Sequence, residues 1–315
     1  MNGKGKGKIM TTKNKGLGRI SIPLITPFDD KEHVDYSMYE QLIDYVIENK
    51  MGDSVISTGT TGEASALLFE ERVRLFETAK KAIKGRCKLI CGTGCVSTYE
   101  TILLTKEAVR VGTDYCLIVA PFYCKPDQEG IYRHYERIAK ETDAQIMLYN
   151  IPVFTGVNID PVTCARLAKL PNIIGIKDES ALNPNQILDY RFATEDIRPD
   201  FIIFNGDDVM LLPTIVQGAQ GIISGAAHIL GHVINNVFDA FEQGRNEVAL
   251  ENFMILYKFC STWTKFGRIH PNPILRPAIE IKTGLRIGAA RGPLAPIQPM
   301  ERAYLEDIMK EIGLI

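Results

Sequence analysis

The residue best placed to do chemistry in this chain is Lys177. It lies in the segment from Asn172 to Asp178, directly after an apolar run of strand type. A lysine on a buried strand loses water, and the loss of water disfavours the ammonium form. We therefore expect a lowered pKa and an amine that can add to a ketone to form a Schiff base. In the competing interpretation, Lys177 only marks the strand end and extends its amine to solvent. The first hypothesis is thus a lyase that acts on keto acids.

Two other parts of the chain could cooperate with such an amine. Thr60 and Thr61 lie in a glycine-flanked loop, where backbone N–H groups and two hydroxyls could bind a carboxylate, although a plain tight turn has the same pattern. Tyr149 carries a phenol that could pass protons beside an imine, although a core tyrosine with a bonded hydroxyl looks the same in a sequence. The combination of the three predicts a site more strongly than any one residue does.

The elements that must position these residues repeat along the chain. Short β-branched runs begin near residues 19, 53, 87, 114, 144, 172, 201 and 220. The segments between them are mostly helical in period, and 36–49 and 70–83 each place their apolar residues on one stripe. Strand and helix in eightfold alternation predict an α/β fold, a parallel (β/α)8 barrel.

In such a barrel, catalytic groups lie at the carboxyl ends of the strands and in the loops that follow. Lys177 and Tyr149 end the sixth and fifth strand runs, and the loops at 59–63, 121–123 and 206–208 follow the second, fourth and seventh. We therefore expect all five to face one mouth of the barrel.

Three segments are expected along the chain. Residues 1–18 are lysine-rich and predict a disordered basic tail, and residues 19–225 hold the eight strand runs of the catalytic barrel. No strand run follows, and residues 226–315 read as helices interrupted by prolines, which predicts a small C-terminal helical domain.

Composition narrows the class of protein. The net charge of −2 gives no electrostatic attraction for nucleic acid or an anionic membrane. No apolar stretch reaches the length of a membrane span, so we expect a cytoplasmic protein. The seven cysteines form no CxxC pair, which favours reduced thiols. Cys87, Cys91 and Cys95 lie on a strand that would not bring them together, so neither a metal nor another cofactor is expected.

The chain resembles the superfamily of dihydrodipicolinate synthase and N-acetylneuraminate lyase, the pyruvate-dependent class I aldolases, over nearly its whole length. The matching motifs are GTTGE at 59–63, PFYCKPDQEGIYRHY at 121–135, YNIPVFTG at 149–156, IIGIKDES at 173–180, NGDD at 205–208 and GIIS at 221–224.

The resemblance implies a role for each matched position. Lys177 would form the Schiff base with pyruvate or another 2-keto acid, Thr60 and Thr61 would hold its carboxylate, and Tyr149 would be the general acid and base. Tyr123 would complete a proton relay with Thr60 and Tyr149 from across a subunit interface. The backbones at two further positions would line the imine pocket, namely Gly206 and Ile223. A homotetramer built as a dimer of dimers is implied as well.

One departure from the family pattern concerns the second substrate. Phe154 stands where dihydrodipicolinate synthases have an arginine that binds the carboxylate of the aldehyde, and a phenyl ring cannot supply that bidentate contact. The motif YNIPVFTG is closer in form to the sialate lyases and 2-keto-3-deoxy sugar acid aldolases of the superfamily, and this resemblance implies aldol cleavage or condensation of a 2-keto-3-deoxy sugar acid. The alternatives are dihydrodipicolinate synthase with aspartate semialdehyde, a hydratase-aldolase for aromatic keto acids with Phe154 as a stacking wall, a non-catalytic keto-acid-binding regulator, and a phosphate-binding barrel.

Overall fold

Eight parallel strands close into a barrel in the computed structural model, which describes residues 16–179 and 183–315. Each strand pairs with the next along the chain, and β8 pairs with β1. The strands are β1 Ile20–Pro23, β2 Ser54–Ser57, β3 Lys88–Gly92, β4 Tyr115–Val119, β5 Ile146–Asn150, β6 Ile173–Asp178, β7 Ile202–Asn205 and β8 Gly221–Ile223. Each strand falls on a predicted run, although β5 and β6 each end one residue beyond theirs, and the predicted fold is confirmed. Residues 1–15 of the predicted tail lie outside the described residues.

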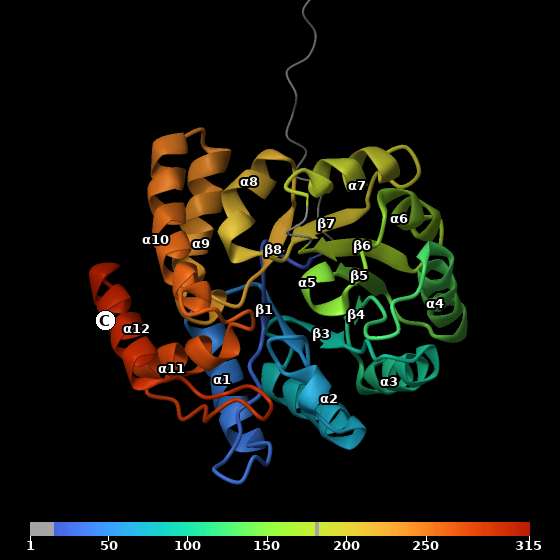
Figure 1. Cartoon of the computed structure of the whole chain (residues 1–315). Coiled ribbons are helices and arrows are strands. Elements are labelled where there is room, and N and C mark those ends of the chain that lie inside the picture. The colour runs from blue at the N-terminus through green and yellow to red at the C-terminus, as the bar shows by residue number, and fades with distance from the viewer. Residues whose placement is uncertain (1–15, 180–182) are drawn as a thin grey trace, which may run out of the picture.

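Helices follow the strands and surround the barrel (Figure 1). They are α1 Tyr36–Glu48, α2 Phe69–Ile83, α3 Thr98–Val111, α4 Gln128–Glu141, α5 Pro152–Thr155, α6 Pro161–Ala168, α7 Gln186–Thr194, α8 Leu211–Val216, α9 Ala227–Glu242, α10 Asn246–Thr264, α11 Asn272–Thr283 and α12 Pro299–Glu311, with 3₁₀ turns η1 Ala64–Ala66 and η2 Asp208–Met210. Local caps explain several starts: Asp35, Ser97 and Asp127 accept backbone N–H groups in the first turns of α1, α3 and α4.

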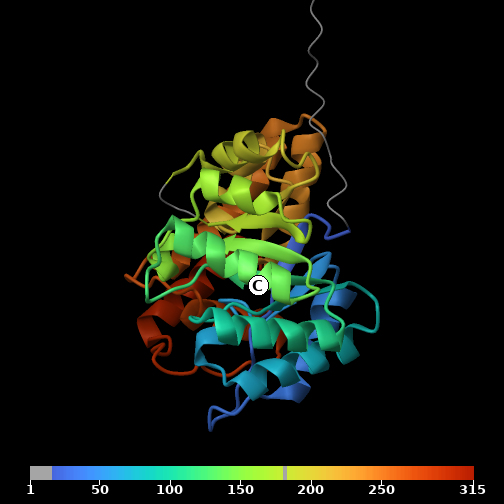
Figure 2. The same ribbon diagram turned by 90° about the vertical axis from the view of Figure 1, so that its right-hand side faces the viewer.

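The strands separate two hydrophobic clusters. Ile56, Leu117 and Phe204 belong to the smaller cluster, which lies inside the barrel and also contains Tyr149. The larger cluster lies between the strands and the surrounding helices, and Figure 2 shows the teal and green helices across the outer face. This division follows from strand alternation, because successive side chains point to opposite faces of a strand.

An irregularity in β6 sets the direction of Lys177. Ile146 of β5 pairs with Ile173, but the next residue, Met147, pairs with Gly175, so β6 contains one extra residue at Ile174. A bulge of this kind shifts the alternation by one position, so that side chains after it exchange faces. Gly175 is required there, because a Cβ would lie 2.4 Å from the carbonyl oxygen of Ile202. As a result Lys177 points into the barrel.

The helices after β8 lie together on one side of the barrel (Figure 1). Helix α9 packs on both β1 and α10, so it belongs to the ring around the barrel as well as to the C-terminal group. The predicted domain boundary at residue 225 therefore stays a prediction. Within the described residues, none of the helices has the length and apolarity needed to cross a membrane.

Candidate active site

Strand alternation after the bulge sends Lys177 and Glu179 to the inner face and Asp178 to the outer face. Asp178 accepts hydrogen bonds from Asn150 Nδ2 at 2.9 Å and Gln186 Nε2 at 3.0 Å, which ties the strand end to its neighbours. Lys177 is only 5% exposed. Its amine is thus presented inside the barrel mouth and does not extend to solvent, so the competing interpretation of a strand-end marker is wrong.

A continuous chain of polar contacts joins Lys177 to the threonine loop. Lys177 Nζ lies 3.1 Å from Glu179 Oε2 and 3.9 Å from the centroid of the Tyr149 ring. The Tyr149 hydroxyl donates to the same Glu179 oxygen at 3.1 Å and lies 3.3 Å from Thr60 Oγ1. Residues from the ends of β2, β5 and β6 therefore meet at one point, as the barrel architecture predicts.

The charge state of the amine differs from the expectation. Burial by itself lowers the pKa of Lys177, but the neighbouring Tyr149 oxygen and Glu179 carboxylate outweigh burial and raise the pKa above its usual value. Burial and the nearby Glu179 charge raise the pKa of Tyr149 to about 12. The predicted lowered pKa of Lys177 is therefore wrong, because Tyr149 and Glu179 lie beside the amine. Both shifts favour an ammonium ion at Lys177 and a neutral phenol at Tyr149.

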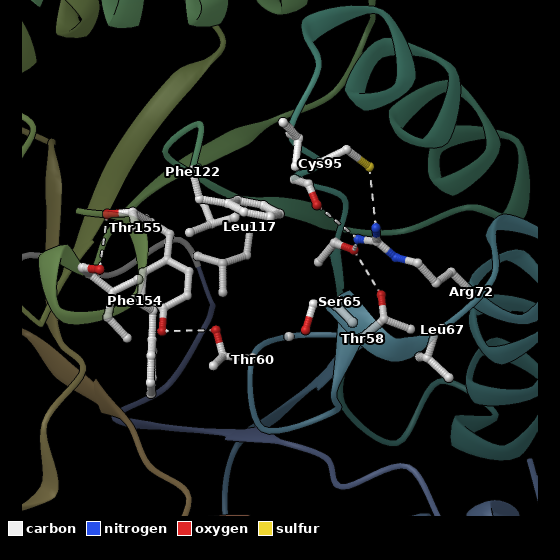
Figure 3. A pocket seen from close by; sticks show the side chains of 18 of the residues that line it. Thr58, Thr60, Ser65, Leu67, Arg72, Cys95, Leu117, Phe122, Phe154 and Thr155 are labelled. Atoms are coloured by element: carbon white, nitrogen blue, oxygen red, sulfur yellow. Dashed lines mark hydrogen bonds between the residues drawn. The ribbon is translucent and has the colours of Figure 1, made fainter. Parts of the chain in front are cut away.

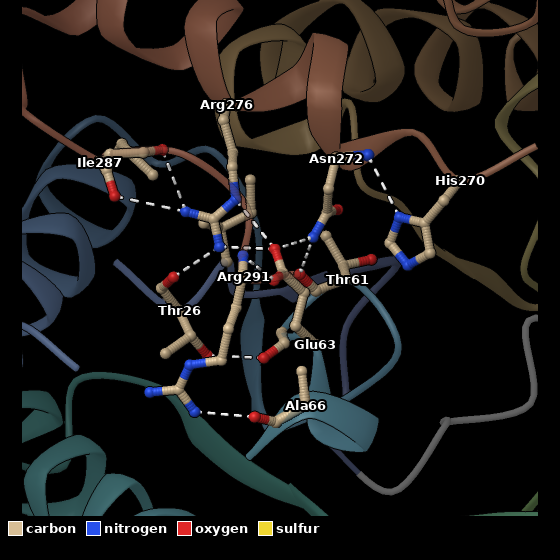
Figure 4. Close-up of polar contacts among 12 residues, drawn as sticks. Thr26, Thr61, Glu63, Ala66, His270, Asn272, Arg276, Ile287 and Arg291 are labelled. Carbon is tan, nitrogen blue, oxygen red and sulfur yellow. Dashed lines mark hydrogen bonds and ion pairs between the residues drawn. The ribbon is translucent and has the colours of Figure 1, made fainter. Parts of the chain in front are cut away.

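The loop that carries Thr60 is held by a buried ion pair with the C-terminal helices (Figure 4). Glu63 adopts a left-handed backbone conformation with φ 57°, and its carboxylate receives Arg276 Nη2 at 2.6 Å and Asn272 Nδ2 at 2.6 Å. The side chains of Glu63 and Arg276 are each 2% exposed. Asn272 Nδ2 also donates to the carbonyl oxygen of Thr61 at 2.9 Å. Helix α11 therefore determines where the threonine loop lies.

The remaining predicted pocket residues lie at the same mouth. A Cβ at Gly206 would lie 2.3 Å from Lys177 Cε, so glycine is needed where β7 ends beside the amine. Ile223 of β8 belongs to the cluster inside the barrel together with Tyr149. Thr61 lies next to Gly225, whose added Cβ would come within 4.0 Å of Thr61 Oγ1.

Thr60 and Tyr149 line a cavity of about 440 Å³, and Figure 3 shows Thr60 among its lining residues. Phe154 on α5 and Arg72 on α2 lie on opposite sides of it. The guanidinium of Arg72 already donates to the carbonyl oxygens of Gly92 at 2.8 Å and Gly94 at 3.2 Å. Arg72 is therefore engaged in holding the loop after β3.

Phe154 forms one wall of this cavity together with a histidine from the C-terminal part of the chain. Its ring lies 5.5 Å from the ring of His270, centroid to centroid, at an interplanar angle of 35°. Burial lowers the pKa of His270, which favours the neutral imidazole. The wall that Phe154 and His270 form is thus aromatic and uncharged.

Tyr123 is not brought to the site within this chain. Its side chain is 91% exposed and its backbone is left-handed, with φ 68°. A large aromatic residue held in that conformation on the surface is uncommon. Its predicted contact with Thr60 and Tyr149 of another subunit stays a prediction.

Two residues of the site were missed in the sequence. Glu179 could have been found by alternation, because it lies two residues after Lys177 and must share its face. His270 carries no such signal, because it approaches Phe154 from a distant part of the chain.

Comparison with known proteins agrees with this geometry. The model of the dihydrodipicolinate synthetase family matches residues 16–312. The 4-hydroxy-tetrahydrodipicolinate synthases of Desulforamulus reducens and Bacillus subtilis are 39% and 36% identical, over 95% and 94% of this chain and 98% and 99% of theirs. The crystal structure of the synthase from Cyanidioschyzon merolae with lysine bound superposes with a TM-score of 0.89 at 35% identity, and covers 95% of this chain and 99% of that one. The chain therefore belongs to the dihydrodipicolinate synthetase family of carbon–carbon lyases, the class I aldolase type.

Proposed function

We propose that this protein binds pyruvate as a Schiff base on Lys177 and condenses it with an aldehyde. The observation that carries the proposal is a buried amine beside a tyrosine hydroxyl, 3.9 Å from its ring, at the carboxyl end of a barrel strand. Thr60 and Thr61 would hold the carboxylate of the keto acid. Tyr149 would supply and remove protons, since its hydroxyl already contacts Thr60 at 3.3 Å.

For the second substrate we infer aspartate semialdehyde, which makes the protein a 4-hydroxy-tetrahydrodipicolinate synthase. The similarity to synthases of that name, at up to 39% identity over nearly the full length of both chains, supports this reaction. It favours the semialdehyde over the 2-keto-3-deoxy sugar acid that Phe154 suggested in the sequence. The tetramer and the cytoplasmic location stay predictions.

A neutral or aromatic aldehyde is the second candidate partner, and the wall formed by Phe154 and His270 favours it. A semialdehyde carboxylate placed against that wall would lack a charge-assisted hydrogen bond, which is worth about 1.5–3 kcal/mol. An aromatic or polyol aldehyde carries no such requirement.

Borohydride trapping tests the first step. Pyruvate and sodium borohydride, added together, should leave one reduced adduct per chain, and peptide mass analysis should locate it on Lys177. The matched control is Lys177→Arg, which keeps the charge and cannot form the imine. An unmodified protein, or adducts spread over surface lysines, would remove the proposal and favour a keto-acid-binding regulator.

A competition assay tests the second step. With pyruvate held fixed, aspartate semialdehyde, a polyol aldehyde and an aromatic aldehyde are offered together, and the products are separated by mass. The semialdehyde product should dominate. If a neutral aldehyde is consumed faster, the second candidate replaces the first.

A further inference from the structure

We propose that Glu179 is a catalytic base of this site, which accepts the proton that Lys177 must lose and then the C3 proton of the bound keto acid. This inference rests on the proposed Schiff base at Lys177. Glu179 was not among the site residues predicted from the sequence, and it adds a third reacting group to the pair of Lys177 and Tyr149.

The position of Glu179 is fixed by the strand ends on both sides of it. Its backbone N–H donates to the carbonyl oxygen of Asn150 at 2.9 Å, which extends the contact between β5 and β6 by one residue. On the other side, a Cβ at Gly206 would lie 3.0 Å from both Glu179 Cβ and Oε2. The glycine therefore leaves room for the carboxylate as well as for the lysine.

The carboxylate oxygen contacts both reacting groups at once. Glu179 Oε2 lies 3.1 Å from Lys177 Nζ and 3.1 Å from the Tyr149 hydroxyl. Its side chain is 24% exposed, compared with 6% for Lys177, so it lies on the solvent side of the amine. A keto carbon bound to Nζ would hold C3 within the reach of this oxygen, because C3 is only two bonds from the nitrogen.

A purely structural role does not account for this contact. An ion pair of low exposure contributes little to stability after the cost of desolvation, and this one keeps the amine in the ammonium form, which cannot attack a ketone. The contact is useful to a nucleophilic lysine only if the carboxylate accepts the proton. Tyr149 cannot do so first, because its phenol, with a pKa near 12, is already protonated at neutral pH.

The proton transfers balance as follows. The Lys177 ammonium gives a proton to Glu179, and the amine lone pair forms the C–N bond while the keto oxygen takes a proton from the Tyr149 hydroxyl. Glu179 then reprotonates Tyr149. The Tyr149 hydroxyl gives a proton to the carbinolamine hydroxyl group, which leaves as water, and takes a proton from the carbinolamine nitrogen. The product is the iminium. Glu179, now a carboxylate, removes a proton from C3. The C–H electron pair forms the C2–C3 double bond and the iminium π pair returns to nitrogen, which gives the nucleophilic enamine.

The charges that face Glu179 come from three strand ends. Lys177 lies on β6 and Tyr149 lies on β5, while Asp207 and Asp208 follow β7. Burial, with the nearby Glu179 charge next, raises the pKa of Asp207 to about 6. Burial also raises the pKa of Asp208 to about 7, with Glu179 a minor contributor. Asp207 and Asp208 therefore have to stay unchanged in every variant whose pH profile is compared with that of the wild type.

The experiment follows the exchange of the pyruvate methyl protons for deuterium in heavy water by NMR, which reports enamine formation without a second substrate. Glu179→Gln keeps the size of the side chain and removes the base, and it should slow exchange about 100-fold or more at saturating pyruvate, the usual scale of general base catalysis. Glu195→Gln, on the surface of the chain, is the matched control and should exchange like the wild type.

Chemical rescue separates a base from a structural residue. Glu179→Ala should lose exchange and regain at least tenfold when formate is added, since formate can occupy the vacated space and accept a proton. The rescue of Glu179→Ala by formate also tests the role of Glu179 if the Glu179→Gln variant does not fold. Exchange within threefold of wild type in Glu179→Gln, or no recovery with formate, would overturn the role of Glu179. If the wild type itself gives no borohydride adduct on Lys177, the proposed function fails instead.

Discussion

The ion pair between Glu63 and Arg276 offers the sharpest test of how the site is held together. The Glu63 carboxylate accepts hydrogen bonds from Arg276 Nε at 2.9 Å and Nη2 at 2.6 Å, from Asn272 Nδ2 at 2.6 Å and from the Arg291 backbone at 2.9 Å. Glu63→Gln removes the charge and leaves the guanidinium of Arg276, on a side chain that is 2% exposed, without its counter-ion. Breaking a buried pair by removing one partner costs about 3–5 kcal/mol of unfolding free energy, and we expect a loss in this range.

Urea unfolding followed by circular dichroism measures this loss, with the slope m compared between variants so that a change of midpoint reports stability. Asp30→Asn is the matched control, because its pair with Arg286 is 82% and 75% exposed and such pairs contribute little. The double variant Glu63→Gln with Arg276→Met should recover part of the loss, since no buried charge is left unpaired. A Glu63→Gln protein within 1 kcal/mol of the wild type would refute the reasoning.

Three further outcomes are expected. Tyr149→Phe removes the proton donor and keeps the ring, so turnover should fall about 100-fold or more in a steady-state assay while the Lys177 adduct still forms slowly; wild-type turnover would show that another group moves the proton. Phe154→Arg introduces a cation beside the cavity and should raise the use of aspartate semialdehyde about 10- to 150-fold relative to a neutral aldehyde in a competition assay; an unchanged ratio would place the semialdehyde carboxylate elsewhere. Burial lowers the pKa of His134 from 6.5 to about 4. Between these two pH values the unfolded chain binds a proton on this imidazole and the native state does not, so His134 lowers the stability of the fold as pH falls from about 6.5 to 4. His134→Gln should therefore lose less stability than the wild type between pH 7 and pH 5 in urea titrations; equal losses would show that His134 is not the group responsible.

The strand count and the placement of Lys177 were predictable from the sequence, because both depend on local patterns. Eight apolar β-branched runs in alternation with amphipathic segments are typical of a parallel barrel. Once the barrel is assumed, the ends of its strands must meet at one mouth, so Lys177, Tyr149 and Thr60 could be grouped before their contacts were known.

Contacts between distant segments could not be predicted in the same way. The partner of Glu63 lies 213 positions along the chain, and no local period relates the two residues. The same is true of Phe154 and His270, which meet only because the C-terminal helices lie against the barrel.

The charge state of the lysine shows why tertiary structure decides chemistry. The sequence by itself placed Lys177 at the end of an apolar strand run, where burial alone would lower the pKa of its amine. The direction of the shift depends on which groups face that amine, and the extra residue at Ile174 in β6 aims Lys177 into the barrel opposite Tyr149. Electrostatic interactions depend on distances of a few ångströms between side chains, and only the folded barrel sets those distances.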